Sequence, residues 1–211
     1  MILFQTSRPQ YAEIEKITQE IQNILGHKLS SLPKDLVGMH SPIEELEKQL
    51  HLDSVDDVRA VGICGMGGIG KTTIATVLYG RISHQFDACC FINDINQVYR
   101  DDGPIGAQKQ IIHQVFGEEQ LQTCNHYNAT NFIRSRLGRI RALLVLDNVD
   151  QVEQLKKLAV HRECLGAGSR VIITSRDAHI LRKYGVDEVY EAQLLNATDS
   201  SVILSKSFQM W

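Results

Sequence analysis

The amino-acid sequence predicts an α/β fold in which a parallel sheet lies between layers of helices. Several runs of strand length are apolar throughout instead of alternating, which is typical of strands covered on both faces. Patterns with helical spacing separate these runs, and strand alternating with helix favours a doubly wound sheet. The chain has 211 residues, of which 43% are hydrophobic and 22% charged. This composition fits one soluble domain with an appendage, or two small domains.

The first part of the chain predicts two helices. Over Tyr11–Leu29, apolar residues recur at the three-and-four spacing that forms one stripe on a helix. A second helix is predicted to open at Ser41, whose hydroxyl can cap it, with Pro42 in its first turn. Its apolar stripe consists of Ile43, Leu46 and Leu50. We therefore expect a linker helix within residues 1–34 and a globular domain over 35–187.

Strands and helices then alternate along the domain, which predicts three layers around about five parallel strands. The strands are expected at Val58–Cys64, Ala88–Ile92, Ala142–Leu146, Val171–Thr174 and, as a short fifth strand, Glu188–Tyr190. The helices between them are expected at Lys71–Ile82, Ala107–Phe116, Ala129–Leu137 and Val152–Leu158.

The final residues, 188–211, predict the start of a further helical unit. A helical pattern covers Asn196–Trp211, and its last four residues include Phe208, Met210 and Trp211. Large apolar side chains at the end of a chain have nothing after them to bury them, so we expect a truncated domain here.

The strand ending at Cys64 leads directly into a phosphate-binding signature. Gly65–Thr72 fits the pattern GxxxxGK[ST] between a predicted strand and a predicted helix, the context in which this motif functions. Glycines allow positive φ angles and let backbone N–H groups approach phosphate oxygens beside the positive end of the helix. Lys71 is expected to reach the outer phosphates, and the Thr72 hydroxyl to bind Mg²⁺. The candidate nucleotide-binding residues in the loop are Gly65, Met66, Gly67, Gly68, Ile69, Gly70, Lys71 and Thr72.

A second buried strand ends in Asp147, and a carboxylate in this position is expected to help hold magnesium. Taken alone, Asp147 could cap a helix or turn after the strand, but the phosphate-binding signature makes this alternative much weaker. Hydrolysis also needs a group that orients and deprotonates the attacking water. The next residue, Asn148, can orient water but cannot accept its proton, and Asp150 lies two residues further on. Asp147 and Asn148 are thus the catalytic candidates, and we expect tight nucleotide binding with slow turnover.

The arginines of the sequence include one candidate phosphate contact and one surface cluster. Arg176 follows a predicted strand, so at the carboxyl edge of the sheet it could contact a γ-phosphate. The alternative is that it pairs with Asp177 or another surface acid. A cluster without interleaved aromatic residues is interpreted as a solvated helix face and strand entry, and consists of Arg134, Arg136, Arg139 and Arg141. With 22 Lys and Arg against 25 Asp and Glu, the net charge is −3, which argues against nucleic acid as a main partner.

The motifs, in this order, resemble the NB-ARC nucleotide-binding domain of plant disease-resistance receptors, a P-loop NTPase of the STAND class. The similar segments are the P-loop Gly65–Thr73, the Walker B segment Leu143–Asp150, the sensor segment Gly168–Arg176 and the block Tyr190–Asn196 that leads into the first helical ARC subdomain. Asp150 at the end of the Walker B segment looks like the TIR subclass, and Pro9–Leu29 is similar to the helix that follows a TIR domain. The resemblance covers roughly residues 35–208.

This resemblance implies ADP or ATP with Mg²⁺ as ligands. It assigns phosphate and magnesium to Lys71 and Thr72, a phosphate to Thr73, and magnesium to Asp147. It assigns the γ-phosphate to Arg176 and the adenine to the segment that contains Val37. Where the family often has a second aspartate, this chain has Asn148. The TIR domain, the later ARC segments and the leucine-rich repeats do not occur in this sequence, so we expect nucleotide binding to be retained more readily than switching.

The function that the resemblance implies is a nucleotide-dependent switch in defence signalling, with ADP favouring a resting state and ATP an open, oligomerising state. Such a module would lie in the cytoplasm or nucleus and join other receptor chains. No run of about eighteen apolar residues predicts a membrane span. Two alternatives remain: a freestanding P-loop ATPase or phosphotransferase, and a truncated product that folds poorly.

Overall fold

A computed structural model describes residues 39–123, 128–158 and 160–193. The predicted helices Tyr11–Leu29 and Asn196–Trp211, and the predicted adenine contact Val37, lie outside these ranges. Within them, every helix is too short or too polar to cross a bilayer.

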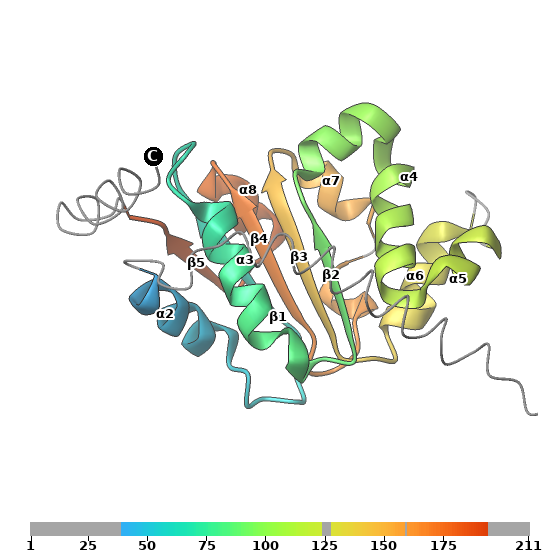
Figure 1. Cartoon of the computed structure of the whole chain (residues 1–211), viewed down its shortest axis with the longest axis horizontal. Helices are drawn as coiled ribbons and strands as arrows, with labels where there is room; N and C mark the ends of the chain where they lie inside the picture. Colours follow the sequence, from blue (N-terminus) through green and yellow to red (C-terminus); the bar gives the residue numbers. More distant parts are fainter. Residues whose placement is uncertain (1–38, 124–127, 159, 194–211) are drawn as a thin grey trace, which may run out of the picture. The chain divides into compact units, whose positions relative to one another are not determined.

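Five parallel strands form one sheet, with the order β2-β3-β4-β1-β5. The strands are β1 (Arg59–Cys64), β2 (Ala88–Ile92), β3 (Ala142–Val149), β4 (Arg170–Ser175) and β5 (Glu188–Glu191). The connections that leave β1 and β4 run in opposite directions across the sheet. Ligands of doubly wound sheets bind at such a reversal, at the carboxyl ends of the strands. The upper edge of the sheet in Figure 1, where β1 meets the helix after it, is therefore the expected position of the site.

Helices cover both faces of the sheet, which confirms the predicted three-layer α/β fold (Figure 1). One layer contains α2 (His40–Leu50) and α3 (Lys71–Ile82); the other contains α4 (Ile95–Phe116), α6 (Ala129–Leu137), α7 (Val152–Lys156) and α8 (Ala178–Tyr184), while α5 (Glu118–Thr123) follows α4. In β1, Val61 and Ile63 pack into the α2 and α3 core, and Ala60 and Cys64 into the opposite core. The strands are apolar on both sides because both faces are buried.

Most predicted elements are confirmed within a few residues, and α3, α6 and β2 have the predicted bounds. The helix predicted at Ala107–Phe116 is the second part of α4. A break at Gly103, with φ 64° and ψ −161°, separates it from a first helical part that begins at Ile95 and was not predicted. The short helices α5 and α8 were not predicted. Ser41 is not the cap of α2: the cap position is Met39, which makes no side-chain cap bond, and Ser41 lies inside the helix.

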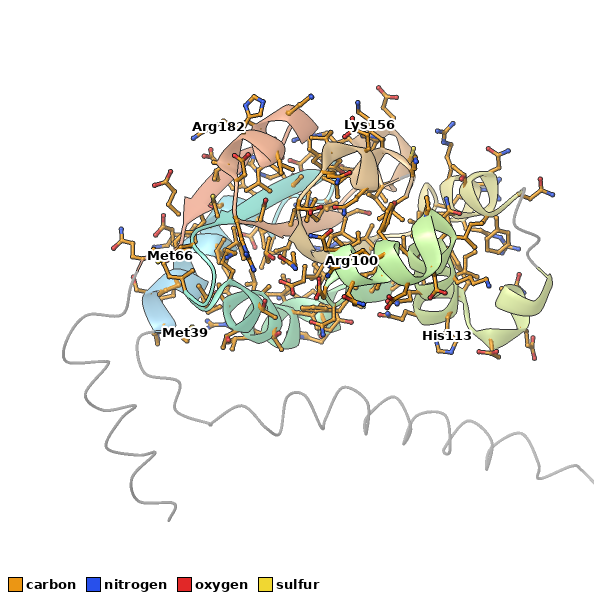
Figure 2. All side chains as sticks on the ribbon, turned by 90° about the horizontal axis from the view of Figure 1, so that it is seen from above. Met39, Met66, Arg100, His113, Lys156 and Arg182 are labelled. Carbon is orange, nitrogen blue, oxygen red and sulfur yellow. The ribbon has the colours of Figure 1, made fainter. Side chains whose placement is uncertain are left out.

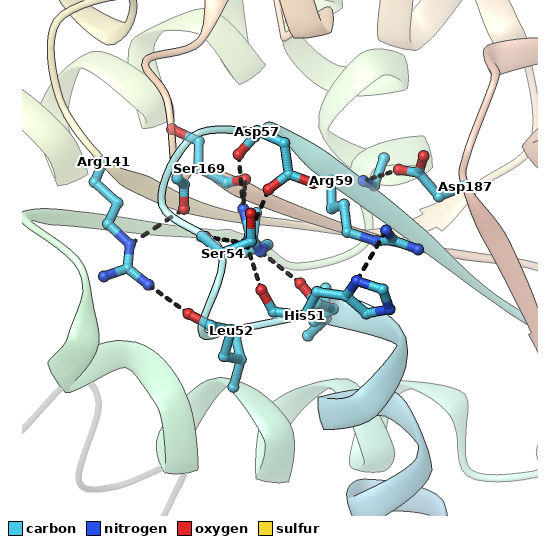
Figure 3. A network of polar contacts seen from close by, with 12 residues as sticks. His51, Leu52, Ser54, Asp57, Arg59, Arg141, Ser169 and Asp187 are labelled. Atoms are coloured by element: carbon cyan, nitrogen blue, oxygen red, sulfur yellow. Dashed lines mark hydrogen bonds and ion pairs between the residues drawn. The ribbon is translucent and has the colours of Figure 1, made fainter.

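At the opposite, amino edge of the sheet, the side chain of Arg170 binds the segment between α2 and β1. Figure 3 shows this segment with His51, Ser54 and Asp57 labelled. Arg170 is fully buried. Its guanidinium donates to the carbonyl oxygens of Leu50, His51 and Ser54, each at 2.6 Å. It also donates to the carbonyl of Asp57 at 2.9 Å and to its carboxylate at 3.3 Å. One side chain therefore attaches α2 and the following loop to β4.

Arg141, at the predicted strand entry directly before β3, belongs to the same network. It is half-buried and donates to the carbonyls of Gly168 at 3.2 Å and Leu52 at 3.1 Å (Figure 3). Its guanidinium carbon lies 4.9 Å from the ring centre of Phe86. The other predicted members of that cluster are exposed, namely Arg134, Arg136 and Arg139. Arg59 donates to the carbonyl of Gln49 at 3.0 Å, and its Nη1 lies 3.2 Å from His51 Nδ1. We call Arg59, Arg141 and Arg170 with their partners, together with Asp187 beside Ala60, the amino-edge network.

Candidate phosphate-binding site

The loop between β1 and α3 has the backbone that the glycine signature predicts. The φ angles of Gly65, Gly68 and Gly70 are +152°, +79° and +101°, values that L side chains rarely adopt. Gly70 is the residue before α3, so the loop runs directly into a helix end whose first N–H groups have no partners within the helix. Met66 extends from the loop and is 62% exposed; Figure 2 shows it at this edge of the molecule.

The predicted phosphate-binding lysine lies against the loop. Lys71 is buried, and its Nζ donates to the carbonyl oxygens of Gly65 at 2.8 Å and Met66 at 2.9 Å. Burial, together with the positive charge of Arg176, lowers the pKa of the Lys71 ammonium, although Asp147 acts in the opposite sense. The loop thus holds a cation whose hydrogen bonds go to backbone carbonyls.

Asp147 is 3% exposed and lies at the centre of a small polar cluster. The Thr72 hydroxyl is 3.0 Å from Asp147 Oδ1 and 3.1 Å from Oδ2, and the Thr174 hydroxyl donates to Oδ1 at 2.6 Å. The carboxylate binds side chains of α3 and β4, and α7 is capped at Gln151 instead. Capping therefore does not explain Asp147. Two oxygen-bearing side chains, Thr72 and Asp147, stand together beside the loop, which fits the ligands that Mg²⁺ prefers.

An irregularity in β3 sets the direction of this cluster. Leu146 pairs with Ile173 and Val149 with Ser175, so Asp147 and Asn148 together face the single residue Thr174. This is a bulge, which bends the strand and redirects its side chains. Asn148 has φ 58°, and its backbone N–H donates to the Thr174 hydroxyl at 2.9 Å. Thr174 therefore contacts both residues of the bulge.

The side chain of Asn148 and that of Asp150 are bonded to neighbouring elements. The Asn148 amide nitrogen donates to Asp94 Oδ1 at 2.8 Å, just after β2. Asp150 is exposed, and its carboxylate accepts a bond of 2.8 Å from Gln154 of α7. The predicted weak catalytic residue is thus held by a carboxylate that the sequence analysis did not single out.

Arg176 is exposed and follows β4 directly. A β-carbon placed on Gly67 would lie 3.5 Å from the guanidinium carbon of Arg176, so this side chain packs beside the phosphate loop. Among the described residues Arg176 forms no ion pair. The alternative pairing with Asp177 is not formed, because that carboxylate caps α8 by accepting from the N–H of His179 at 2.7 Å.

The structure thus brings the predicted residues from Gly65 to Thr73, Asp147, Asn148 and Arg176 to one edge of the sheet. Thr73 is half-buried in the first turn of α3. Thr174 and Asp94 complete the cluster. Thr174 was visible as one of several polar residues at the end of a strand, whereas no local pattern pointed to Asp94.

Comparison with known sequences gives one consistent result. The family model for the NB-ARC domain matches residues 39–210. The disease resistance protein RUN1 of Vitis rotundifolia is 38% identical over 92% of this chain and 14% of its own length. The disease resistance-like protein DSC2 of Arabidopsis thaliana is 34% identical over 90% of this chain and 17% of its own length. The chain therefore spans about a sixth of these relatives or less.

Solved structures show the same fold in more distant proteins. Cdc6p from Pyrobaculum aerophilum superposes with a TM-score of 0.62 at 16% identity, over 82% of this chain and 50% of that protein. The ORC2 protein of Aeropyrum pernix, solved in complexes with ADPNP and ADP, has a TM-score of 0.58 at 18% identity, over 83% of this chain and 52% of that one. At these identities the likeness concerns the fold.

Proposed function

The chain belongs to the NB-ARC family, and from this premise we propose that it is an ADP- and ATP-binding module of a plant immune receptor, in which the bound nucleotide sets the signalling state. The observation that carries the proposal is the pair of cations at the glycine loop. Lys71 is bonded to backbone carbonyls, and Arg176 packs beside Gly67 without an ion pair in the described part of the chain. Two like charges beside helix N–H groups favour a polyanion such as a di- or triphosphate.

Each residue of the cluster has a role in this proposal. Lys71 and the loop N–H groups bind the phosphates, and Thr73 adds a hydroxyl in the first helical turn. Thr72 and Asp147 would hold Mg²⁺, which when bound neutralises charge on the phosphates. Thr174 donates to Asp147 at 2.6 Å and so keeps one carboxylate oxygen in a fixed direction.

We expect slow hydrolysis because the residue after Asp147 offers no proton acceptor. An amide can hold a water molecule but remains unprotonated at neutral pH. Asp150 is engaged by Gln154 on the side of α7. A general base contributes about a hundred- to ten-thousandfold to such reactions, so a chain without one retains mainly the binding function.

The switch follows from the difference between the two nucleotides. Arg176 can bind a γ-phosphate, which ADP lacks, and a ligand shifts a conformational equilibrium by its difference in affinity for the two states. As a module of a larger receptor, the chain would act in the cytoplasm or nucleus and assemble with other receptor chains. We expect no role for nucleic acid in this function.

The proposal is tested by releasing the nucleotide from the purified chain and identifying it by mass spectrometry. We expect roughly one ADP per chain. Lys71→Ala should weaken ADP and ATP binding by about ten- to a hundredfold, the value of one charge-assisted contact. Lys109→Ala, at an exposed lysine of α4, is the matched control and should bind normally. Unchanged affinity of a folded Lys71→Ala variant would contradict the proposal.

Two further measurements separate the alternatives. A single-turnover rate of about 1 per second or faster would indicate a freestanding ATPase instead of a switch. Saturating Mg-ADP should stabilise a competent chain by about 2.7 kcal/mol when its concentration is about a hundred times Kd. No shift of the melting temperature would favour the alternative of a truncated product that folds poorly.

A further inference from the structure

Two side chains connect the ends of β2 and β3 at the carboxyl edge of the sheet. The amide nitrogen of Asn148 donates to Asp94 Oδ1 at 2.8 Å, and the residues are 54 positions apart in the sequence. A carboxylate accepts hydrogen bonds and does not donate them, so the amide nitrogen must face Asp94. The other branch of the amide, Oδ1, has no hydrogen bond within the described ranges. It is therefore the oxygen that can accept a bond from water.

The backbone at both positions restricts which residues fit. Asp94 has φ 48° and Asn148 has φ 58°, both in the left-handed region. Among residues with a β-carbon, asparagine and aspartate adopt this region most readily. Asp94 also caps α4, because its Oδ1 accepts from the N–H of Gln97 at 3.3 Å, and asparagine caps a helix about as well as aspartate. Each position can therefore carry either side chain.

The order of the strands gives the two positions different distances from the phosphate loop. The sheet order places β2 at the outer edge, then β3, then β4, and then β1, which carries the loop. Asp94 follows β2, whereas Asn148 lies in β3. The carboxylate of the pair is thus one strand farther from the loop strand than the amide.

We propose that Asp94 is a positioning residue for ATP hydrolysis, because it fixes the Asn148 amide. In this proposal turnover is slow because the amide of the pair lies in β3, nearer the phosphate loop, and the carboxylate lies after β2. The inference rests on the proposed nucleotide site. In hydrolysis, the water oxygen bonds to the γ-phosphorus while the bond to the β,γ-bridging oxygen breaks and ADP leaves with that electron pair. Because Asn148 cannot take the water proton, the proton passes to an oxygen of the γ-phosphate, which leaves as dihydrogen phosphate. With a carboxylate at position 148, the proton would pass to that carboxylate instead.

Exchanging the two side chains tests this proposal. The double variant Asp94→Asn with Asn148→Asp keeps the hydrogen bond with its direction reversed and places the carboxylate in β3. We expect its single-turnover rate to rise at least about tenfold, a conservative share of what a general base contributes. Asp94→Asn alone should not raise the rate, because it places no carboxylate in β3. Asn148→Asp alone should gain less than the double variant, because nothing then fixes the new carboxylate.

Melting temperatures without nucleotide give a second readout. Asn148→Asp alone places two carboxylates in contact, and like charges at this distance are unfavourable, so we expect a loss of at least about 3 °C. Adding Asp94→Asn should restore the melting temperature. The matched control is Asp101→Asn, the same change on an exposed carboxylate of α4 that binds Gln97, and it should alter neither quantity.

Three results would overturn the inference. The first is that the double variant hydrolyses ATP as slowly as the unaltered chain. The second is that Asn148→Asp alone is as fast as the double variant. The third is that the melting shifts of the two single variants add up in the double variant, which would show that the pair does not act as one unit. ADP affinity, measured in every variant, should stay within about threefold, because no phosphate contact is removed. If Lys71→Ala also binds ADP normally, the proposed nucleotide site is wrong. The melting temperatures of the two single variants and the double variant then still show whether Asp94 and Asn148 interact.

Discussion

The two ends of β4 each carry an arginine, and the two side chains have opposite environments. Arg170, at the amino edge, is fully buried and makes six hydrogen bonds, five of them to backbone carbonyl oxygens. Arg176, just past the carboxyl edge, is exposed and packs beside Gly67 without an ion pair in the described residues. The same residue type therefore serves structure at one edge and is available to a ligand at the other.

This contrast shows how to separate structural from functional charges in a parallel sheet. A buried cation must satisfy its donors within the protein, because an unpaired one costs several kcal/mol. At the amino edge, the carbonyls at the end of α2 and in the next loop meet that need. At the carboxyl edge, Arg176 has no ion pair among the described residues, and in the proposed function it binds an external anion beside the helix N–H groups.

The largest expected effect comes from removing the satisfied arginine. Arg170→Ala leaves the carbonyls of Leu50, His51 and Ser54 without their buried donor, so we expect a loss of about 3–5 kcal/mol in the free energy of unfolding. Chemical denaturation measures this directly. Arg139→Ala, at an exposed arginine, is the control and should change stability by less than about 0.5 kcal/mol. Equal losses of unfolding free energy in both variants would mean that the buried hydrogen bonds of Arg170 do not stabilise the amino edge.

The next effect concerns binding instead of stability. Arg176→Ala should leave the free energy of unfolding within about 0.5 kcal/mol of the unaltered chain, since the side chain is exposed. It should weaken ATP binding by about ten- to a hundredfold while ADP binding changes little, because only ATP carries the γ-phosphate. Calorimetric titration with each nucleotide separates the two. A loss of stability, or an equal loss for ADP and ATP, would place Arg176 with the structural arginines.

The phosphate loop could be predicted from the sequence because its signal is local. The backbone needs glycine at fixed positions, and the lysine and threonine follow in the next helical turn, so Gly65–Thr72 carries both the loop and its chemistry. The same holds for β1 and α3, whose apolar patterns repeat over a few residues. Asp147 was predictable as the polar end of an apolar strand.

The other residues of the two edges were beyond sequence reasoning because their partners are far away along the chain. Arg170 binds carbonyls about 120 positions earlier, and Asp94 meets Asn148 only because β2 lies beside β3. Neither contact produces a periodic pattern in the sequence. The part of α4 before Gly103 was missed. The structure has a helix there as well, and a kink at Gly103 separates it from the helix that the sequence predicted.

The smallest expected effect tests the outer part of the amino-edge network, at Asp187 (Figure 3). Its carboxylate accepts from the N–H of Ala60 at 2.9 Å, which attaches the start of β5 to β1, and it pairs with Arg162. Burial raises the pKa of Asp187, but the bonds from Arg162 and Ala60, with the charges of Arg162 and Arg59, outweigh it, so the pKa lies below the ordinary 3.8.

A lowered pKa in the folded state means that ionised Asp187 stabilises the fold above about pH 3.8, and that this stabilisation is lost as the pH falls through the folded-state pKa. Asp187→Asn keeps an acceptor for Ala60 but removes the charge, so it should cost about 0.5–1 kcal/mol at pH 7. The difference between the two chains should shrink as the pH falls below 4, where the unaltered chain also loses the charge. Because all other carboxylates are common to both chains, their titration cancels in this difference. A difference that stays constant from pH 7 to pH 3 would mean that Asp187 acts by its hydrogen bond alone, and that the charge of Arg162 contributes nothing to this edge.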